Sequence, residues 1–194
     1  ELLARLTRTG NYAMMLVGGP LRIVLVTTHL PLSKVGSSLS KEKIYQTIRL
    51  TWDNMRYFGT RKPRIGVAGL NPHAGEEGLF GREEKRFIVP AVKKAKKKGM
   101  KVAGPIPPDT IFHRALKGEF DCVVCMYHDQ GLIPLKMLAF DKGVNVTLGL
   151  PIIRTSVDHG TAYEIVGKGV ANPGSLIEAI RLAAQLAVAR KGNR

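Results

Sequence analysis

The chain has 194 residues, of which 44% are hydrophobic and 23% are charged, and this is enough for one domain with a full core. Its apolar runs stay well short of the roughly 20 residues that a membrane-spanning helix needs, so the composition argues against a membrane partner and we expect a cytoplasmic protein. Lys and Arg outnumber Asp and Glu by 30 to 15, a formal net charge of +15, which favours an anionic partner, either a nucleic acid or a small anionic substrate.

Short apolar runs alternate with helical stretches along the chain. This alternation predicts an α/β domain with a largely parallel sheet, and the continuous apolar strands indicate that helices flank the sheet on both faces. We expect residues 1–194 to form a single α/β unit. The predicted strands are Leu21–Val26, Arg64–Leu70, Lys101–Ala103, Asp121–Met126 and Val144–Leu148. The predicted helices are Lys41–Tyr57, Glu83–Lys98, Thr110–Leu116, Leu132–Leu138 and Ser175–Ala189.

The cysteines, Cys122 and Cys125, both lie in the apolar run "FDCVVCMY". A C-x-x-C pair can be a redox centre or half of a zinc site, but a redox pair normally begins a helix and a zinc site needs further ligands. On a predicted strand, two residues three positions apart face opposite sides. We therefore interpret both cysteines as packing residues.

The run "VKKAKKKGMK", residues 92–101, carries part of the excess positive charge. It has no interleaved aromatic residues for base stacking. Glu83 and Glu84 lie at the start of the predicted helix and the lysines lie near its end, as the helix dipole favours. We interpret the run as a solvated helix face, with a nucleic-acid-binding module as the alternative from another class.

Three of the five histidines follow predicted strands: His29 in "VTTHLPL", His73 in "NPHAGEEG" and His128 in "YHDQG". The carboxyl ends of parallel strands share one edge of a sheet, where ligands bind. The three imidazoles should therefore converge. Imidazole suits zinc, cobalt and similar divalent ions, and three protein ligands with one open position are what a catalytic metal needs. The sequence predicts a metal site at this edge.

Two acidic residues lie close to these histidines in the sequence, Asp109 in "PIPPDT" and Asp129 beside His128. Either could orient a ligand histidine, complete the coordination sphere or accept a proton. The alternative for each is a helix N-cap. The glycines of "NPHAGEEGLFG" would form a tight loop with exposed amide donors, which suits an anion.

Four segments, "VTTHLPL", "GLNPHAGE", "MYHDQGLIPLK" and "GVNVTLGLPIIRTSVDHGTAYEIVGKG", together resemble the 4-hydroxythreonine-4-phosphate dehydrogenase family of pyridoxal phosphate (vitamin B6) biosynthesis. The resemblance runs in order across essentially the whole chain. It implies an isocitrate/isopropylmalate dehydrogenase-like fold and an NAD-dependent, metal-dependent homodimer with its active site at the subunit interface. The implied reaction is oxidation and decarboxylation of 4-phosphooxy-L-threonine to 3-amino-2-oxopropyl phosphate.

The resemblance also implies roles for individual residues. The metal ligands fall on the three strand-end histidines, with zinc, cobalt or magnesium as the ion. The substrate contacts fall on Lys136, Asn145 and Arg154, of which the two cations suit a phosphate or carboxylate. The proton acceptor stays open among Asp109, Asp129 and Lys136.

The segment "DHGTAYEIVGKGVANPG", residues 158–174, resembles the adenosine-binding loop of isopropylmalate dehydrogenases and implies NAD contacts at Gly160, Thr161 and Asn172. A helix cap and turn is the alternative for these three residues. His159 is expected to belong to this loop, and His113 to a helix surface.

Two further questions stay open at this stage. In the family, the helix that matches "ELLARLT" follows a Gly-His-Thr sequence and a sizeable N-terminal region that the printed sequence does not contain. We therefore expect the chain to be the C-terminal portion of a longer one and to lack part of the substrate pocket and part of the sheet, and its activity alone is an open question. Relatives oxidise 4-phospho-D-threonate or 4-phospho-D-erythronate, which lack the amino group, and no residue decides between these substrates.

Overall fold

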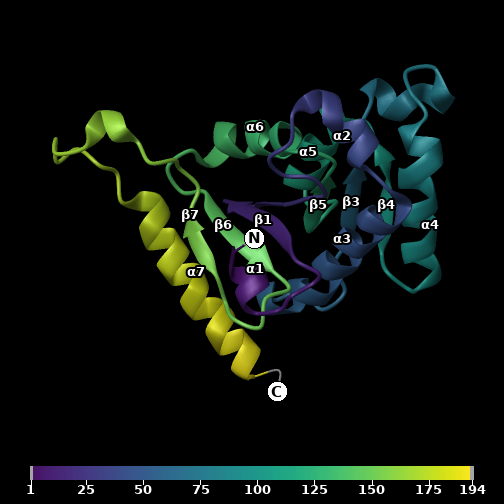
Figure 1. Cartoon of the computed structure of the whole chain (residues 1–194). Helices are drawn as coiled ribbons and strands as arrows, with labels where there is room; N and C mark the ends of the chain where they lie inside the picture. Colours follow the sequence, from purple (N-terminus) through teal and green to yellow (C-terminus); the bar gives the residue numbers. More distant parts are fainter. Residues whose placement is uncertain (1, 193–194) are drawn as a thin grey trace.

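The computed structural model describes residues 2–192 and contains a seven-stranded sheet with the strand order β4-β3-β5-β2-β1-β6-β7 (Figure 1). The strands are β1 (Ala13–Gly18), β2 (Leu21–Leu25), β3 (Ile65–Ala68), β4 (Val102–Ile106), β5 (Cys122–Cys125), β6 (Val144–Leu148) and β7 (Thr155–Val157). The α-helices are α1 (Leu2–Leu6), α2 (Leu32–Ser38), α3 (Lys41–Asn54), α4 (Val89–Lys97), α5 (Pro108–Leu116), α6 (His128–Ala139) and α7 (Gly174–Lys191). Short turns of other helix types are η1 (Met55–Phe58), η2 (Pro72–Gly78), η3 (Glu84–Ile88) and η4 (Tyr163–Ile165).

The sheet has two halves of different kinds. Strands β4, β3, β5 and β2 pair in parallel, which confirms the predicted parallel sheet there. Strands β1, β6 and β7 pair antiparallel with their neighbours. The prediction missed β1 and β7, because β1 is the methionine-rich run "AMMLVG" and β7 has only three residues. The missed β1 forms a hairpin with β2 through Gly19 and Pro20.

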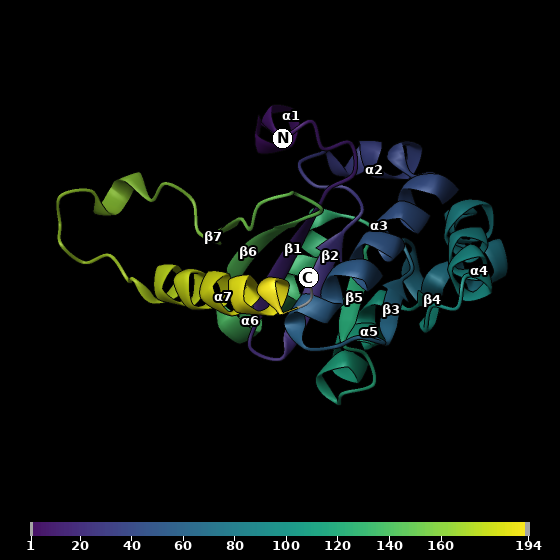
Figure 2. The ribbon, with the colours of Figure 1, turned by 90° about the horizontal axis from the view of Figure 1, so that it is seen from below.

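Helices cover both faces of the sheet, as the continuous apolar strands indicated (Figure 2). One core cluster joins residues of α3, α4 and α7 to the sheet, and a second joins residues of α5 and α6 to the opposite face. Cys122 belongs to the first cluster and Cys125 to the second. Burial raises the pKa of the Cys122 thiol to about 12. The interpretation of both cysteines as packing residues is confirmed.

The predicted helices 83–98 and 132–138 differ most from the observed ones at their N-terminal ends. The predicted helix 83–98 begins with the π-helical turn η3 and continues as α4, which has Pro90 in its first turn, where proline is tolerated. The helix predicted to start at Leu132 starts at His128, and Pro134 lies inside it. Because α6 begins immediately after β5, His128 is the first residue of a helix at the sheet edge.

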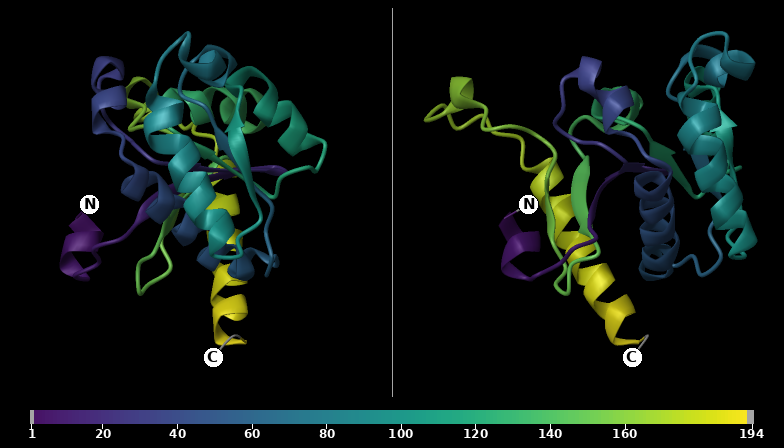
Figure 3. Two further views of the ribbon diagram at one scale, coloured as in Figure 1. Left: turned by 90° about the vertical axis from the view of Figure 1, so that its right-hand side faces the viewer. Right: turned by 45° about the vertical axis from the view of Figure 1, so that its right-hand side comes forward.

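Two segments depart from the layered body. Helix α1 lies apart from the sheet, and residues 158–173, here called the projecting segment, extend from the body between β7 and α7 (Figures 1 and 2). Helix α7 packs along β7 and extends past the sheet toward the C-terminus (Figure 3). None of the helices in the described part of the chain is long and apolar enough to cross a membrane. The N-terminal residue of the predicted opening helix lies outside the described residues.

Candidate active site at the carboxyl edge of the parallel strands

The three parallel strands β3, β5 and β2 are neighbours in the sheet, so the segments that follow them lie at one edge. His73, His128 and His29 follow these strands in that spatial order. The ring centroids of His29 and His128 lie 5.5 Å apart, with an interplanar angle of 45°. The predicted common edge is therefore present, and it brings two of the three imidazoles together.

The His29 and His128 pair fits the requirements of a divalent metal. Two imidazoles that bind one tetrahedral ion, at metal–nitrogen distances of about 2.0–2.1 Å, have ring centroids about 5 Å apart. His128 Nδ1 lies 2.6 Å from Asp129 Oδ1, which leaves Nε2 for a ligand. A carboxylate that holds the second nitrogen of a ligand histidine is a common feature of metal sites. Asp129 thus makes the contact with His128 that one of its predicted options, the orientation of a ligand histidine, would require.

His73 lies apart from this pair. It sits in a left-handed turn with φ of 52°, and its exposed ring contacts that of Phe80 at a centroid distance of 5.9 Å. Within residues 2–192, no group of three His, Cys, Asp or Glu side chains is close enough to hold a metal ion. One chain therefore supplies a two-histidine arrangement at this edge, with the third histidine on the neighbouring loop.

A cavity of about 690 Å³ lies beside His29. Arg154 and Asn145 line it from the antiparallel half of the sheet, and Arg154 Nη1 donates to Asn145 Oδ1 at 3.1 Å and to Thr147 Oγ1 at 3.4 Å. Lys43 of α3 adds a second cation. The cavity therefore offers an imidazole, a guanidinium, an amide and an ammonium group, a set that suits a small anionic molecule.

Buried polar side chains tie the strand ends together, and the sequence reasoning missed them. Thr27, 2% exposed, donates through Oγ1 to the carbonyl oxygen of Met126 at 2.7 Å, which joins the end of β2 to the end of β5. Gln130, 7% exposed, accepts from the N–H of Met126 and donates to the carbonyl oxygen of Gly69, both at 2.7 Å. The sequence signal that could have indicated Thr27 and Gln130 was that each lies within two residues of a strand-end histidine, His29 or His128.

Lys136 lies on α6, half-buried and outside the lining of the cavity. Its charge reaches Asp158, a half-buried carboxyl at the start of the projecting segment. Burial raises the pKa of Asp158, and the positive charges of Lys136, His128 and His159 oppose this rise. The sequence reasoning also missed Asp158, although it lies in the quoted run "SVDHGTA".

The alternative assignment of Asp109 and Asp129 as helix N-caps is wrong. Both helices begin earlier than predicted, so that the N-cap residues are Pro107 for α5 and Tyr127 for α6. Asp109 instead lies exposed in the first turn of α5 and does not line the cavity. His113 is exposed on α5, which confirms its expected place on a helix surface.

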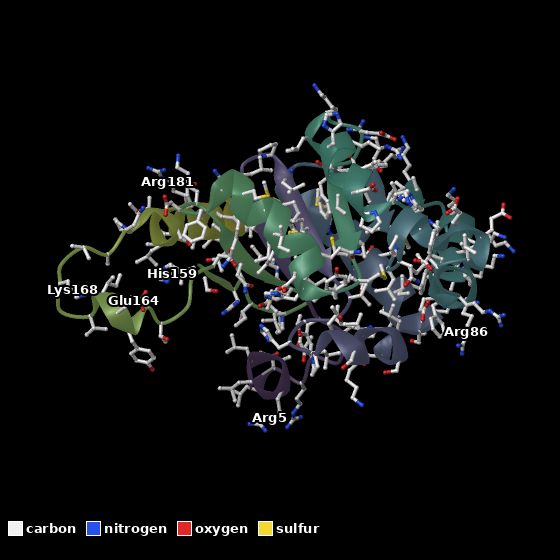
Figure 4. The ribbon with its side chains drawn as sticks, turned by 90° about the horizontal axis from the view of Figure 1, so that it is seen from above. Arg5, Arg86, His159, Glu164, Lys168 and Arg181 are labelled. Atoms are coloured by element: carbon white, nitrogen blue, oxygen red, sulfur yellow. The ribbon has the colours of Figure 1, made fainter. Side chains whose placement is uncertain are left out.

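The predicted NAD contacts, Gly160, Thr161 and Asn172, are all exposed on the projecting segment and do not line the cavity. Asn172 Oδ1 accepts the N–H of Gly174 at 2.9 Å, which is the local turn before α7 that was the alternative for this residue. His159 bonds the neighbouring Gly160 carbonyl oxygen. Figure 4 shows Glu164 and Lys168 on this segment, away from the rest of the molecule.

The sequence and structure of this chain are similar to those of known proteins. The model of the family described as "Pyridoxal phosphate biosynthetic protein PdxA" matches residues 1–183. The chain belongs to the PdxA family. The 4-hydroxythreonine-4-phosphate dehydrogenase of Desulforapulum autotrophicum is 57% identical over 195 residues, which cover 100% of this chain and 57% of that protein. The D-threonate 4-phosphate dehydrogenase of Cupriavidus necator is 51% identical, over 98% of this chain and 57% of that protein.

Solved structures agree with the PdxA assignment. The 4-hydroxythreonine-4-phosphate dehydrogenase from Klebsiella pneumoniae superposes with a TM-score of 0.88 at 49% identity, covering 96% of this chain and 56% of that one. An isocitrate dehydrogenase from Methylococcus capsulatus, at 14% identity, gives a TM-score of 0.60, which confirms the expected isocitrate dehydrogenase-like fold. The chain thus spans a little over half the length of the PdxA relatives that it matches.

Proposed function

We propose that this chain is part of an NAD-dependent dehydrogenase that acts on a small phosphorylated substrate. Its contribution is the set of side chains at the carboxyl edge of the parallel strands. The substrate that we favour is 4-phosphooxy-L-threonine, oxidised and decarboxylated to 3-amino-2-oxopropyl phosphate. The observation that carries the proposal is the cavity in which His29 lies with Arg154 and Asn145. Membership of the PdxA family supports the reaction class.

In the proposed reaction, a hydride leaves the substrate's alcohol carbon for NAD⁺, and the hydroxyl proton leaves for a base or water. The resulting 3-oxo acid then loses its carboxylate as CO₂, and the enolate that is left takes up a proton from water at the carbon that carried the carboxylate. Arg154 binds the phosphate or carboxylate of the substrate, because its planar guanidinium donates two parallel hydrogen bonds. Asn145, held by Arg154, offers both a donor and an acceptor to the substrate's other polar groups. Lys136, as the neutral amine, contacts the hydroxyl group of the substrate.

We assign the divalent metal, zinc, cobalt or magnesium, to His29 and His128, with His73 as the third ligand. When bound, such an ion supplies Lewis-acid polarisation of an alcohol or enolate oxygen. Asp129 bonds His128 and orients its ring, so we do not choose it from the three candidate bases. Lys136 and His128 both act electrostatically on Asp158, whereas Asp109 is exposed and does not line the cavity. We therefore favour Lys136, as the neutral amine, as the proton acceptor.

A homodimer would complete the site. Helix α6, which carries His128 and Lys136, also exposes Ile133 and Met137 (83% exposed), and its C-cap residue Phe140 is exposed beside them. Exposed apolar side chains gathered on one helix mark an interaction surface, and a second copy would cover them beside the site. The projecting segment, with Gly160, Thr161 and Asn172, is the proposed contact for NAD.

Side-by-side turnover tests the proposal. NADH formation at 340 nm is followed with 4-phosphooxy-L-threonine, 4-phospho-D-threonate and 4-phospho-D-erythronate, with and without added Zn²⁺, Co²⁺ or Mg²⁺. The assay uses this chain and, in parallel, a chain that has the full length of its PdxA relatives. We expect metal-dependent turnover, highest with 4-phosphooxy-L-threonine in the longer chain. A higher kcat/KM with either sugar acid would move the substrate assignment to that compound, and turnover in metal-free buffer would remove the metal role.

The nucleic-acid alternative has less support. Of the basic run, Lys94 is bonded to Glu42 at 2.7 Å and lies over the ring of Tyr45. This engagement reduces the charge available to a phosphate backbone. Specific binding would require tight association that weakens steeply with salt. A titration of fluorescent double-stranded DNA at 50 and 200 mM salt should show only weak binding.

A further inference from the structure

One buried carboxylate lies directly behind the loop that carries His73. Glu84, 3% exposed, is the first residue of the π-helical turn η3. A buried carboxylate is unfavourable unless its oxygens are hydrogen-bonded, and those of Glu84 are. Oε1 accepts the backbone N–H groups of Leu70 and Asn71, both at 2.8 Å, and Oε2 accepts from Asn71 Nδ2 at 2.9 Å. Glu84 therefore binds the chain where it leaves β3.

The loop beyond this point has a conformation that L-residues avoid. The five residues from His73 to Glu77 all have positive φ, between 38° and 82°, and only Gly75 among them is a glycine. Left-handed backbone in non-glycine residues is unfavourable and persists where the surroundings enforce it. A Cβ on Gly75 would lie 2.6 Å from Glu84 Oε2. The carboxylate thus packs against the turn as well as bonding the residues before it.

Asn71 links Glu84 to a second carboxylate. Its Nδ2 donates to Glu83 Oε2 and to Glu84 Oε2, both at 2.9 Å. The bond from Asn71 lowers the pKa of Glu83, which is therefore ionised at neutral pH. With two carboxylates as acceptors, the Asn71 amide has one allowed orientation. If one acceptor became a donor, no orientation of Asn71 would satisfy both neighbours.

We propose that Glu84 is a positioning residue for His73, acting through Asn71 and the two backbone N–H groups to hold the left-handed turn. A π-turn inserts one extra residue into a helix and is frequent at functional sites. Here it places Glu84 behind the turn. The consequence for metal binding rests on the proposed function, in which His73 is a ligand; the consequence for the position of His73 does not.

The test compares E84Q with two matched variants. E77Q removes a carboxylate from the same loop, where Glu77 is exposed, and controls for charge. E83Q/E84Q makes both neighbours of Asn71 amides, so that Asn71 can turn its Oδ1 toward two donors and the network is restored without either carboxylate. The readouts are the imidazole Cε1–H resonance of His73, assigned by its loss in H73A, and the Kd for Co²⁺ from visible absorption. Far-UV circular dichroism monitors the fold.

We expect E84Q to shift the His73 resonance and weaken Co²⁺ binding by about 10- to 100-fold, the usual effect of losing an outer-shell partner. E77Q should stay within about twofold, and E83Q/E84Q should recover most of the loss. An unshifted His73 resonance in folded E84Q, or no recovery in E83Q/E84Q, would overturn the proposal. If H73A binds Co²⁺ as tightly as the unmodified chain, His73 is not a metal ligand and that part of the proposed function is wrong. The shift of the His73 resonance in E84Q then still tests whether Glu84 positions His73.

Discussion

The ends of the parallel strands and the projecting segment are both loops, yet they are held in different ways. At the strand ends, buried side chains such as Thr27, Gln130 and Glu84 bond the backbone of a neighbouring strand or loop. In the projecting segment, the side-chain bonds of His159 and Asn172 reach only residues one or two positions away. The comparison shows that one edge of the sheet is organised to hold side chains in fixed positions. In the segment, the described long-range bond is at its base, where the Asp158 N–H donates to Ser175 Oγ at 3.2 Å.

The largest expected effect comes from removing a histidine at the organised edge. H128A should lower kcat/KM by more than about 100-fold, because losing a first ligand should exceed the 10- to 100-fold effect of outer-shell changes. The free energy of unfolding should change by less than about 1 kcal/mol, since the ring is partly exposed. NADH formation and urea unfolding measure both quantities. H113A, on the exposed face of α5, is the control and should retain full activity.

The next largest effect should come from removing the hydrogen bonds of Gln130, which join the ends of β5 and β3. Q130L leaves the N–H of Met126 and the carbonyl oxygen of Gly69 without partners and should lower the free energy of unfolding by about 3 kcal/mol. Urea unfolding measures the change. Q185A, at an exposed position on α7, should change stability by less than about 0.5 kcal/mol. Equal effects of the two substitutions would contradict the role of Gln130.

The start of β3 offers a pH-dependent test. Asp121 accepts from the backbone N–H of Arg64 at 2.7 Å and pairs with its guanidinium at 2.9 Å. Burial raises the pKa of Asp121, but the bonds from Arg64 outweigh this and the pKa is lowered. A lowered pKa in the folded state adds stability above the unfolded value of about 3.9, and this stability is lost as pH falls through the folded pKa.

D121N should therefore lower the free energy of unfolding by about 1 kcal/mol at pH 7, since Arg64 is half exposed. The difference between the two proteins should shrink once the pH falls below about 3.9 and vanish below the lowered pKa of Asp121 in the folded state. Urea unfolding across this range measures it. A difference that is independent of pH would show that the pair acts through packing rather than charge.

The smallest effect should come from the projecting segment. Tyr163 is 80% exposed, so Y163S should change the free energy of unfolding of a single chain by less than about 0.5 kcal/mol. A larger loss that grows with protein concentration would instead place this residue in the proposed dimer contact. Thermal unfolding at two protein concentrations separates these outcomes.

The sequence predicted those features that depend on periodicity and on strand ends. The buried runs of β2, β3 and β5 placed His29, His73 and His128 at one edge, because parallel strands end together. The family resemblance indicated Asn145 and Arg154, whose contact follows from the register of β6. The first prediction needed only the order of elements along the chain, whereas the second needed the motifs that carry the resemblance.

The ties between strands could not be predicted in this way. The bonds of Thr27, Gln130 and Glu84 depend on which strands are neighbours and on local helix starts, neither of which has a periodic signal. The position of His73 depends on five consecutive left-handed residues, four of them not glycine, and side-chain type alone does not predict such a turn.

Paramagnetic relaxation tests the central claim most directly, that the carboxyl edge of the parallel strands is the ion- and ligand-binding site. Mn²⁺ is added in substoichiometric amounts to the ¹⁵N-labelled protein, and amide cross-peaks are followed in ¹H–¹⁵N spectra. The account predicts that the amides of His29, Leu30 and Asp129 broaden first, while those of the projecting segment persist. Selective broadening elsewhere, or none at this edge, would contradict it.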